Sequence, residues 1–185
     1  LRAWLRLLPF ATPVTDLPGI VRSMPDAQRD PSMLEEMIGG LISSSSDEAE
    51  SVTFTLAEAN PRLYQNHQWR ATVLSFGTVS AARRLVDLTV SGALDGKSYD
   101  GWRWKRELGG LISEFSEVRT YVYDLLKDGL TTKRLALLAS AVAEDPGTEG
   151  VQTLIDCEMK TGRSFMTWQS IQSVVTEHVP AESWE

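Results

Sequence analysis

The densest group of side chains suited to binding is Trp102-Arg103-Trp104-Lys105-Arg106. An exposed aromatic ring beside an Arg guanidinium can stack on a partner and make cation–π contacts, and such residues often dominate the energy of an interface. Helical spacing places Trp104 in an apolar stripe and Trp102 on the opposite side, one turn from Arg106. The sequence therefore predicts a binding site made of Trp102, Arg103, Lys105 and Arg106. In a helical solenoid, packing of Trp102 on the adjacent repeat is the commoner outcome, and this alternative stays open.

The glycine-rich stretch 92–98 is similar to a phosphate-binding loop, but its spacing and its context differ from that motif. Gly92 stands one residue too close to the pair Gly96-Lys97. A phosphate-binding loop also follows a strand, whereas residues 81–89 have the apolar spacing of a helix. We therefore expect a turn between two helices here, and no nucleotide binding.

Residues for metal or nucleophile chemistry are few. His67 and His178 are the only histidines, far apart in the chain, and Cys157 is the only cysteine. We expect Cys157 near the buried edge of its helix, where a lone cysteine acts as a small apolar side chain. The acidic pairs Glu35-Glu36 and Asp47-Glu48 stand near predicted helix starts, where negative charge favours the helix dipole. We expect no catalytic residue, no metal, no cofactor and no enzymatic activity.

Composition restricts the partners and the compartment. The formal net charge of −7 and the pI of about 4.9 disfavour nucleic-acid binding by the chain as a whole. One cysteine permits no internal disulfide, which is typical of a reducing compartment, so we expect a cytoplasmic location. No apolar run approaches the roughly 20 residues that cross a bilayer, so we expect no membrane insertion.

A repeated pentapeptide indicates how the chain is organised. Gly39-Gly40-Leu41-Ile42-Ser43 returns 70 residues later as Gly109-Gly110-Leu111-Ile112-Ser113. This offset is twice about 35 residues, the length of a helical hairpin repeat. Two adjacent glycines inside a helix cost stability, so their recurrence predicts that a neighbouring backbone approaches closely there. Local fraying of the helix is the alternative.

Apolar spacing, Pro and Gly stops and capping residues predict helices throughout. The expected helices cover residues 1–8 (closed by Pro9), 17–24, 31–43 (capped by Asp30), 47–60 (capped by Ser45 and Glu48), 66–76, 78–91, 101–115, from 117 onward with Gly129 as the C′ residue, 132–144, 148–161 and 164–177. The predicted fold class is all-α, a right-handed α-α superhelix of HEAT-like helical hairpins. We expect one α-solenoid domain over residues 1–185, with irregular helices over 1–29 and about four to five hairpins over 30–185. We also expect the chain to be a piece of a longer protein.

Two resemblances to known families add an expectation about function. The hairpin period with its Pro and Gly stops resembles HEAT-like α-solenoids. The segments 137–146 (LLASAVAEDP) and 173–184 (SVVTEHVPAESW) resemble the C-terminal helical region of bacterial NACHT-type signalling ATPases. The second resemblance implies that this chain is a sensor or partner-binding arm, with the ATPase module outside it.

The resulting hypothesis is a non-catalytic module that binds a protein or another ligand. An enzyme on a HEAT-like scaffold, such as a DNA glycosylase, is an alternative that needs a basic groove holding an aromatic residue and a carboxylate. A purely structural helical segment is a third possibility.

Overall fold

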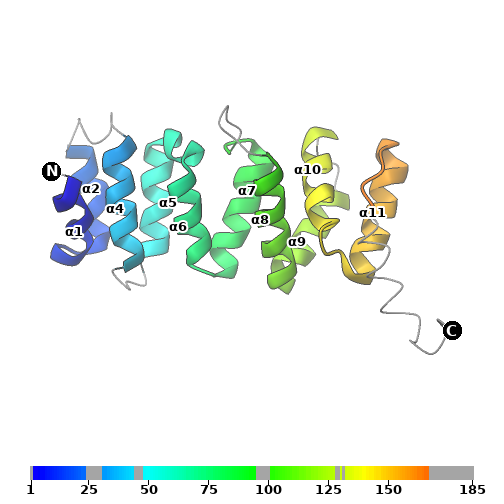
Figure 1. Cartoon of the computed structure of the whole chain (residues 1–185), viewed down its shortest axis with the longest axis horizontal. Coiled ribbons are helices and arrows are strands. Elements are labelled where there is room, and N and C mark those ends of the chain that lie inside the picture. Colours follow the sequence, from blue (N-terminus) through cyan, green and yellow to red (C-terminus); the bar gives the residue numbers. More distant parts are fainter. Residues whose placement is uncertain are drawn as a thin grey trace. The chain divides into compact units, whose positions relative to one another are not determined.

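The computed structural model describes residues 2–23, 31–43, 48–94, 101–127, 130 and 132–166 (Figure 1). Every regular element within these ranges is an α-helix or a short 3-10 helix. The predicted all-α fold class is therefore confirmed.

The chain divides into two compact units. The N-terminal unit comprises Leu1–Ala81 with Ala93–Ser98, and the C-terminal unit comprises Ala82–Gly92 with Tyr99–Glu185. The single solenoid domain over residues 1–185 stays a prediction.

In the N-terminal unit, helices that alternate along the chain pack against each other. Its elements are α1 (Arg2–Ala11), η1 (Val14–Asp16), α2 (Leu17–Ser23), α4 (Pro31–Ser43), α5 (Ala49–Ala59), η2 (Pro61–Gln65) and α6 (His67–Ser75). Helix α4 contacts α1 and α6, while α2 contacts α5. Stacked helical hairpins pack in this way, each layer taking every second helix.

The predicted end of the first helix at Pro9 is wrong, because α1 continues through Pro9 to Ala11. Beyond the proline, the backbone N–H of Thr12 still donates to the carbonyl of Leu8 at 3.1 Å. Pro9 is buried, and its ring lies beside Gly40 of α4. We attribute the continuation to this packing, which compensates for the one hydrogen bond that proline removes.

The core of the N-terminal unit centres on the fully buried Trp69. The rings of Phe54 and Tyr64 meet it edge-on, with centroid distances of 5.7 and 5.1 Å. The indole Nε1 donates to the carbonyl of Thr53 at 3.2 Å, so the buried polar atom is satisfied. Asn66 caps α6, since its side-chain oxygen accepts from the backbone N–H of Gln68 at 2.6 Å.

The C-terminal unit repeats the alternating pattern. Helix α7 (Val79–Ser91) belongs to it from Ala82 onward and is followed by α8 (Gly101–Glu114), α9 (Ser116–Lys127), α10 (Thr132–Val142) and α11 (Gly147–Thr161). Helix α8 contacts α10 and α9 contacts α11, in addition to the contacts within the two hairpins. Gly162, with φ of +67°, ends α11 in the left-handed conformation that glycine accepts most readily.

Two of the predicted features fall wholly or mostly on residues that the structure does not describe. The predicted capping residue Ser45 lies outside the described residues, and so does most of the helix predicted over residues 164–177. Its first three residues, which are described, are not helical. The 3-10 helix η2 was not expected, because Pro61 indicated only the end of a helix.

The predicted close approach at the glycine pairs is confirmed, at one glycine of each pair. A Cβ on Gly40 would overlap the carbonyl oxygen of Arg6 in α1. A Cβ on Gly109 would lie 2.9 Å from the carbonyl oxygen of Ala141 in α10. Glycine is thus required where α4 meets α1 and where α8 meets α10.

Candidate functional site

One side of α8 belongs to the core of the C-terminal unit. Trp104 is 1% exposed, and Leu108 and Ile112 are equally buried one and two turns further along the helix. The prediction that Trp104 lies in an apolar stripe is confirmed. Trp104 therefore contributes to folding and is not accessible to a partner.

Another side of α8 is open to solvent. The side chain of Arg103 is 56% exposed, and Arg106 and Gly110 are exposed as well. Nothing lies within 4 Å of the position that a Cβ on Gly110 would take. The backbone of Trp102 belongs to α8, but its side chain lies outside the described part of the chain.

The charged residues of the predicted site are divided between two directions. Arg103 Nε donates to Glu107 Oε1 at 2.9 Å, along the exposed side of α8. Lys105 Nζ lies 2.8 Å from Glu144 Oε1, beyond the end of α10. Because positions 103 and 105 are about 200° apart around the helix, Lys105 does not join Arg103 and Arg106.

Sequence reasoning did not include the two carboxylates that pair with these cations. The spacing of Arg103 and Glu107, four residues apart on one helix, is a signal that could have revealed the first pair. Glu144 reaches Lys105 only through the packing of α8 on α10, and no local pattern shows it.

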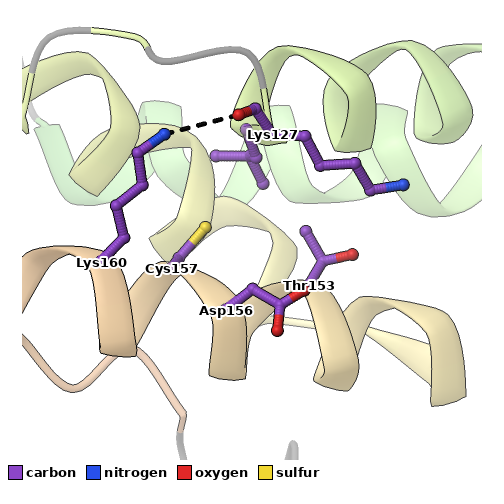
Figure 2. Close-up of a pocket in the computed structure, with 6 residues that line it drawn as sticks. Lys127, Thr153, Asp156, Cys157 and Lys160 are labelled. Atoms are coloured by element: carbon purple, nitrogen blue, oxygen red, sulfur yellow. Dashed lines mark hydrogen bonds between the residues drawn. The ribbon is translucent and has the colours of Figure 1, made fainter.

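A cavity of about 230 Å³ opens between α9 and α11 (Figure 2). Its lining residues are Leu126, Lys127, Thr153, Asp156, Cys157 and Lys160. The ammonium group of Lys160 donates to the backbone carbonyl of Lys127 at 3.4 Å, so it serves the C-terminal end of α9. The cavity thus combines apolar atoms with a cation that already contacts the backbone.

The thiol in this cavity is not an activated nucleophile. Cys157 is 3% exposed, and burial raises the pKa of its thiol, although nearby Lys160 opposes the effect. The thiolate is the nucleophilic form, so a raised pKa leaves the thiol protonated and unreactive at neutral pH. The burial of Cys157 agrees with the small apolar role expected from the sequence.

A polar cluster between α7 and α9 was not foreseen. The hydroxyl of Tyr121 donates to a carboxylate oxygen of Asp87, and the guanidinium of Arg83 lies 4.5 Å from the centre of the tyrosine ring. The hydrogen bond to Asp87, followed by burial, raises the pKa of Tyr121. A neutral tyrosine held in this way joins two helices and is not a proton-transfer group at neutral pH.

Within the described ranges, no group of three or more His, Cys, Asp and Glu side chains could hold a metal ion. Among the same residues, no helix combines the length and apolar character needed to cross a bilayer. Residues 95–98 of the glycine-rich stretch lie outside the described residues, so the absence of nucleotide binding stays a prediction.

Comparison with known proteins finds no match among protein-family models, curated proteins or solved structures. The HEAT-like and NACHT-type resemblances therefore stay predictions.

Proposed function

We propose that this chain is a non-catalytic helical-repeat module that binds a partner protein through the exposed side of α8. The observation that carries the proposal is the contrast within α8. Trp104 is buried in the core, whereas Arg103, Arg106 and Gly110 are exposed on another side of the same helix. Arginine is enriched among the residues that dominate interfaces, and Trp102 would add an aromatic anchor one turn before Arg106.

The wider architecture in this proposal is a right-handed α-α superhelix of HEAT-like hairpins. It is supported by the alternating contacts in each unit, α1 with α4 in one and α8 with α10 in the other. With the NACHT-type resemblance, the proposed role is the sensor arm of a larger signalling ATPase in the cytoplasm.

A protein partner is favoured over a nucleic acid for electrostatic reasons. The chain carries a net charge of −7, which repels a polyanion at long range. Arg103 also lies against the carboxylate of Glu107, which reduces the positive potential of the exposed side of α8. The HEAT-like glycosylase alternative would need this potential for phosphate binding.

The test separates folding from binding by comparing Trp102→Ala with Trp104→Ala. Trp104→Ala should unfold at a clearly lower temperature, whereas Trp102→Ala should melt close to the unchanged protein. A partner protein is first isolated through its binding to the unchanged protein and is then purified. Calorimetry should show that it binds Trp102→Ala and Arg106→Ala at least about tenfold more weakly than the unchanged protein. Lys133→Ala, an exposed cation on α10, is the matched control and should bind normally.

Two results would contradict the proposal. If Trp102→Ala destabilises the chain as much as Trp104→Ala, Trp102 is a packing residue. If the purified partner binds Trp102→Ala and Arg106→Ala as tightly as the unchanged protein, the contact surface lies elsewhere on the chain.

A further inference from the structure

Three exposed residues of α8 form a row along the helix, with a glycine in the middle. Arg106, Gly110 and Glu114 succeed one another every four residues, and all three are exposed. Arg106 precedes Gly110 by about 6 Å along the helix axis, and Glu114 follows it by the same distance. The row therefore carries a cation at one end and an anion at the other, equally far from the glycine.

Gly110 is the point of the row where another helix can come closest to α8. Glycine inside a helix costs stability relative to alanine, yet a Cβ at Gly110 would meet nothing within 4 Å. At Gly40 and Gly109, by contrast, a Cβ would collide with a carbonyl oxygen of the helix packed against it. Gly110 thus leaves room for a helix that comes from outside the chain.

We propose that this row is the contact surface between two copies of the chain, with α8 packed antiparallel on α8 of a second copy. The inference rests on the proposed binding role of α8 and names the partner. A two-fold axis at Gly110 places Arg106 of each copy opposite Glu114 of the other, because both residues are equally far from the glycine. Rows of residues four apart are also the rows along which helices most often pack.

The charges of the row favour a second copy over a uniformly acidic or basic partner. Glu114 would repel an acidic helix, and Arg106 would repel a basic one. A helix that pairs with both ends must carry the opposite charges at the same spacing, and α8 itself does so when it runs in the reverse direction. Arg103 is not needed for this pairing, since its guanidinium contacts Glu107 of the same helix.

The dimer should be weak, and this determines the range of protein concentration to be tested. A single pair of helices buries less than the roughly 1,200 Å² of a standard interface. The net charge of −7 on each copy also opposes association. We therefore expect a monomer–dimer equilibrium that becomes visible in sedimentation of the full chain between about 10 μM and about 1 mM.

The test is a charge reversal with rescue. Arg106→Glu places two carboxylates opposite each other at both ends of the contact and should raise the dimer dissociation constant at least about tenfold. Glu114→Arg should have the same effect with two cations. The double variant Arg106→Glu/Glu114→Arg restores both pairs in the reverse sense and should dimerise like the unchanged protein.

Two further variants separate the dimer from the fold. Gly110→Leu fills the space at the axis and should abolish the dimer, although its side chain enters open space in the monomer and should leave the melting temperature unlowered. Lys133→Glu reverses an exposed charge on α10 and should leave the dimer unchanged.

A chain that stays monomeric at about 1 mM overturns the inference, and so does a dimer that Arg106→Glu or Gly110→Leu leaves unchanged. A double variant that folds but does not dimerise means that Arg106 and Glu114 do not face each other. In each case the proposed function still stands if a separately isolated partner binds Arg106→Ala more weakly than the unchanged protein. If Arg106→Ala weakens neither the dimer nor the binding of that partner, both proposals fail.

Discussion

Helices α4 and α8 end in nearly the same sequence, yet each uses a different glycine to approach its neighbour. In α4 the second glycine, Gly40, lies against Arg6 of α1, and a Cβ on Gly39 would meet nothing within 4 Å. In α8 the first glycine, Gly109, lies against α10, and a Cβ on Gly110 would meet nothing. Adjacent positions in a helix point about 100° apart, so the two glycines of a pair serve different sides.

Which glycine of a pair lies at the contact depends on which neighbouring helix packs against α4 or α8. Helix α1 precedes α4 in the chain, whereas α10 follows α8. A pair of glycines allows close approach from either side, and the packing of each unit decides which glycine is used. The repeat therefore marks where a helix can be approached, and it does not specify the partner.

The largest expected effect tests a buried position that recurs in both helices, each in the core of its own unit. Trp104 and Leu34 stand at matching positions, 70 residues apart, and each is 1% exposed. Trp104→Ala should cost about 3–5 kcal/mol of the free energy of unfolding, and Leu34→Ala about 2–5 kcal/mol, because each leaves a cavity. Urea unfolding at 25 °C measures both. A loss below about 1 kcal/mol for either would contradict the shared core position.

The second effect tests the glycines directly. Gly40→Ala and Gly109→Ala should each cost about 1–3 kcal/mol, because the new methyl group meets backbone that cannot move without separating the helices. Gly40→Ala should cost more, since the obstacle at Gly109 is less close. Urea unfolding of both variants gives the order.

The other glycine of each pair, which does not lie against a neighbouring helix, is the matched control for this comparison. Gly39→Ala and Gly110→Ala add a methyl group in open space, and alanine favours a helix over glycine by about 1 kcal/mol. Both should therefore be neutral or slightly stabilising. If Gly39→Ala proved as damaging as Gly40→Ala, the assignment of one glycine to each contact would be wrong.

The helices and the need for close approach could be predicted because both depend on local sequence. Apolar spacing, Pro31 at a helix start and Gly162 at a helix end all act within a few residues of their own position. The continuation of α1 through Pro9 could not be predicted, because it depends on contact with Gly40, far along the chain.

The candidate site was foreseen only in part, for the same reason. The burial of Trp104 follows from helical spacing. The pairing of Lys105 with Glu144, the Tyr121 contact with Asp87 and the choice between Gly39 and Gly40 all depend on which helices meet. A single sequence does not fix these tertiary contacts.

A third, smaller effect concerns how α8 ends. Arg119 of α9 donates from Nη2 to the carbonyl of Ser113 at 2.7 Å and from Nε to that of Ile112 at 3.3 Å. The residue at the matching position of the first copy is Ala49, which has no such donor. Arg119→Ala should therefore cost about 1–2 kcal/mol in urea unfolding, as expected for hydrogen bonds to a charged group that is partly exposed.

Arg119→Lys tests whether the planar fork of the guanidinium matters. Lysine keeps the charge but cannot donate to two carbonyls with the same geometry. The stability lost in Arg119→Lys should therefore be smaller than that lost in Arg119→Ala, but not zero. Arg106→Ala, at an exposed position of α8, should change stability by less than about 0.5 kcal/mol. If Arg119→Ala also costs less than about 0.5 kcal/mol, the hydrogen bonds of Arg119 contribute little to stability.

The smallest effect at neutral pH concerns the helices that follow the two glycine pairs. Tyr123 of α9 matches Thr53 of α5, and both are buried. The hydroxyl of Tyr123 donates to the carbonyl of Pro146 at 2.9 Å. Tyr123→Phe removes this bond and should cost about 1 kcal/mol at pH 7.

This cost should depend on pH in a specific direction. Burial raises the pKa of Tyr123 to about 12, while an unfolded chain has a tyrosine pKa of about 10. Above about pH 10 the unfolded state loses the proton and the native state keeps it, so the contribution of Tyr123 to stability falls as the pH rises. The stability gap between the unchanged protein and Tyr123→Phe should be constant below about pH 9, narrow above about pH 10 and change sign before about pH 12, because each pH unit in this range removes up to about 1.4 kcal/mol. Urea unfolding at stepped pH measures the gap, and a gap that stays constant through pH 11 would show that the tyrosine is not desolvated in the native state.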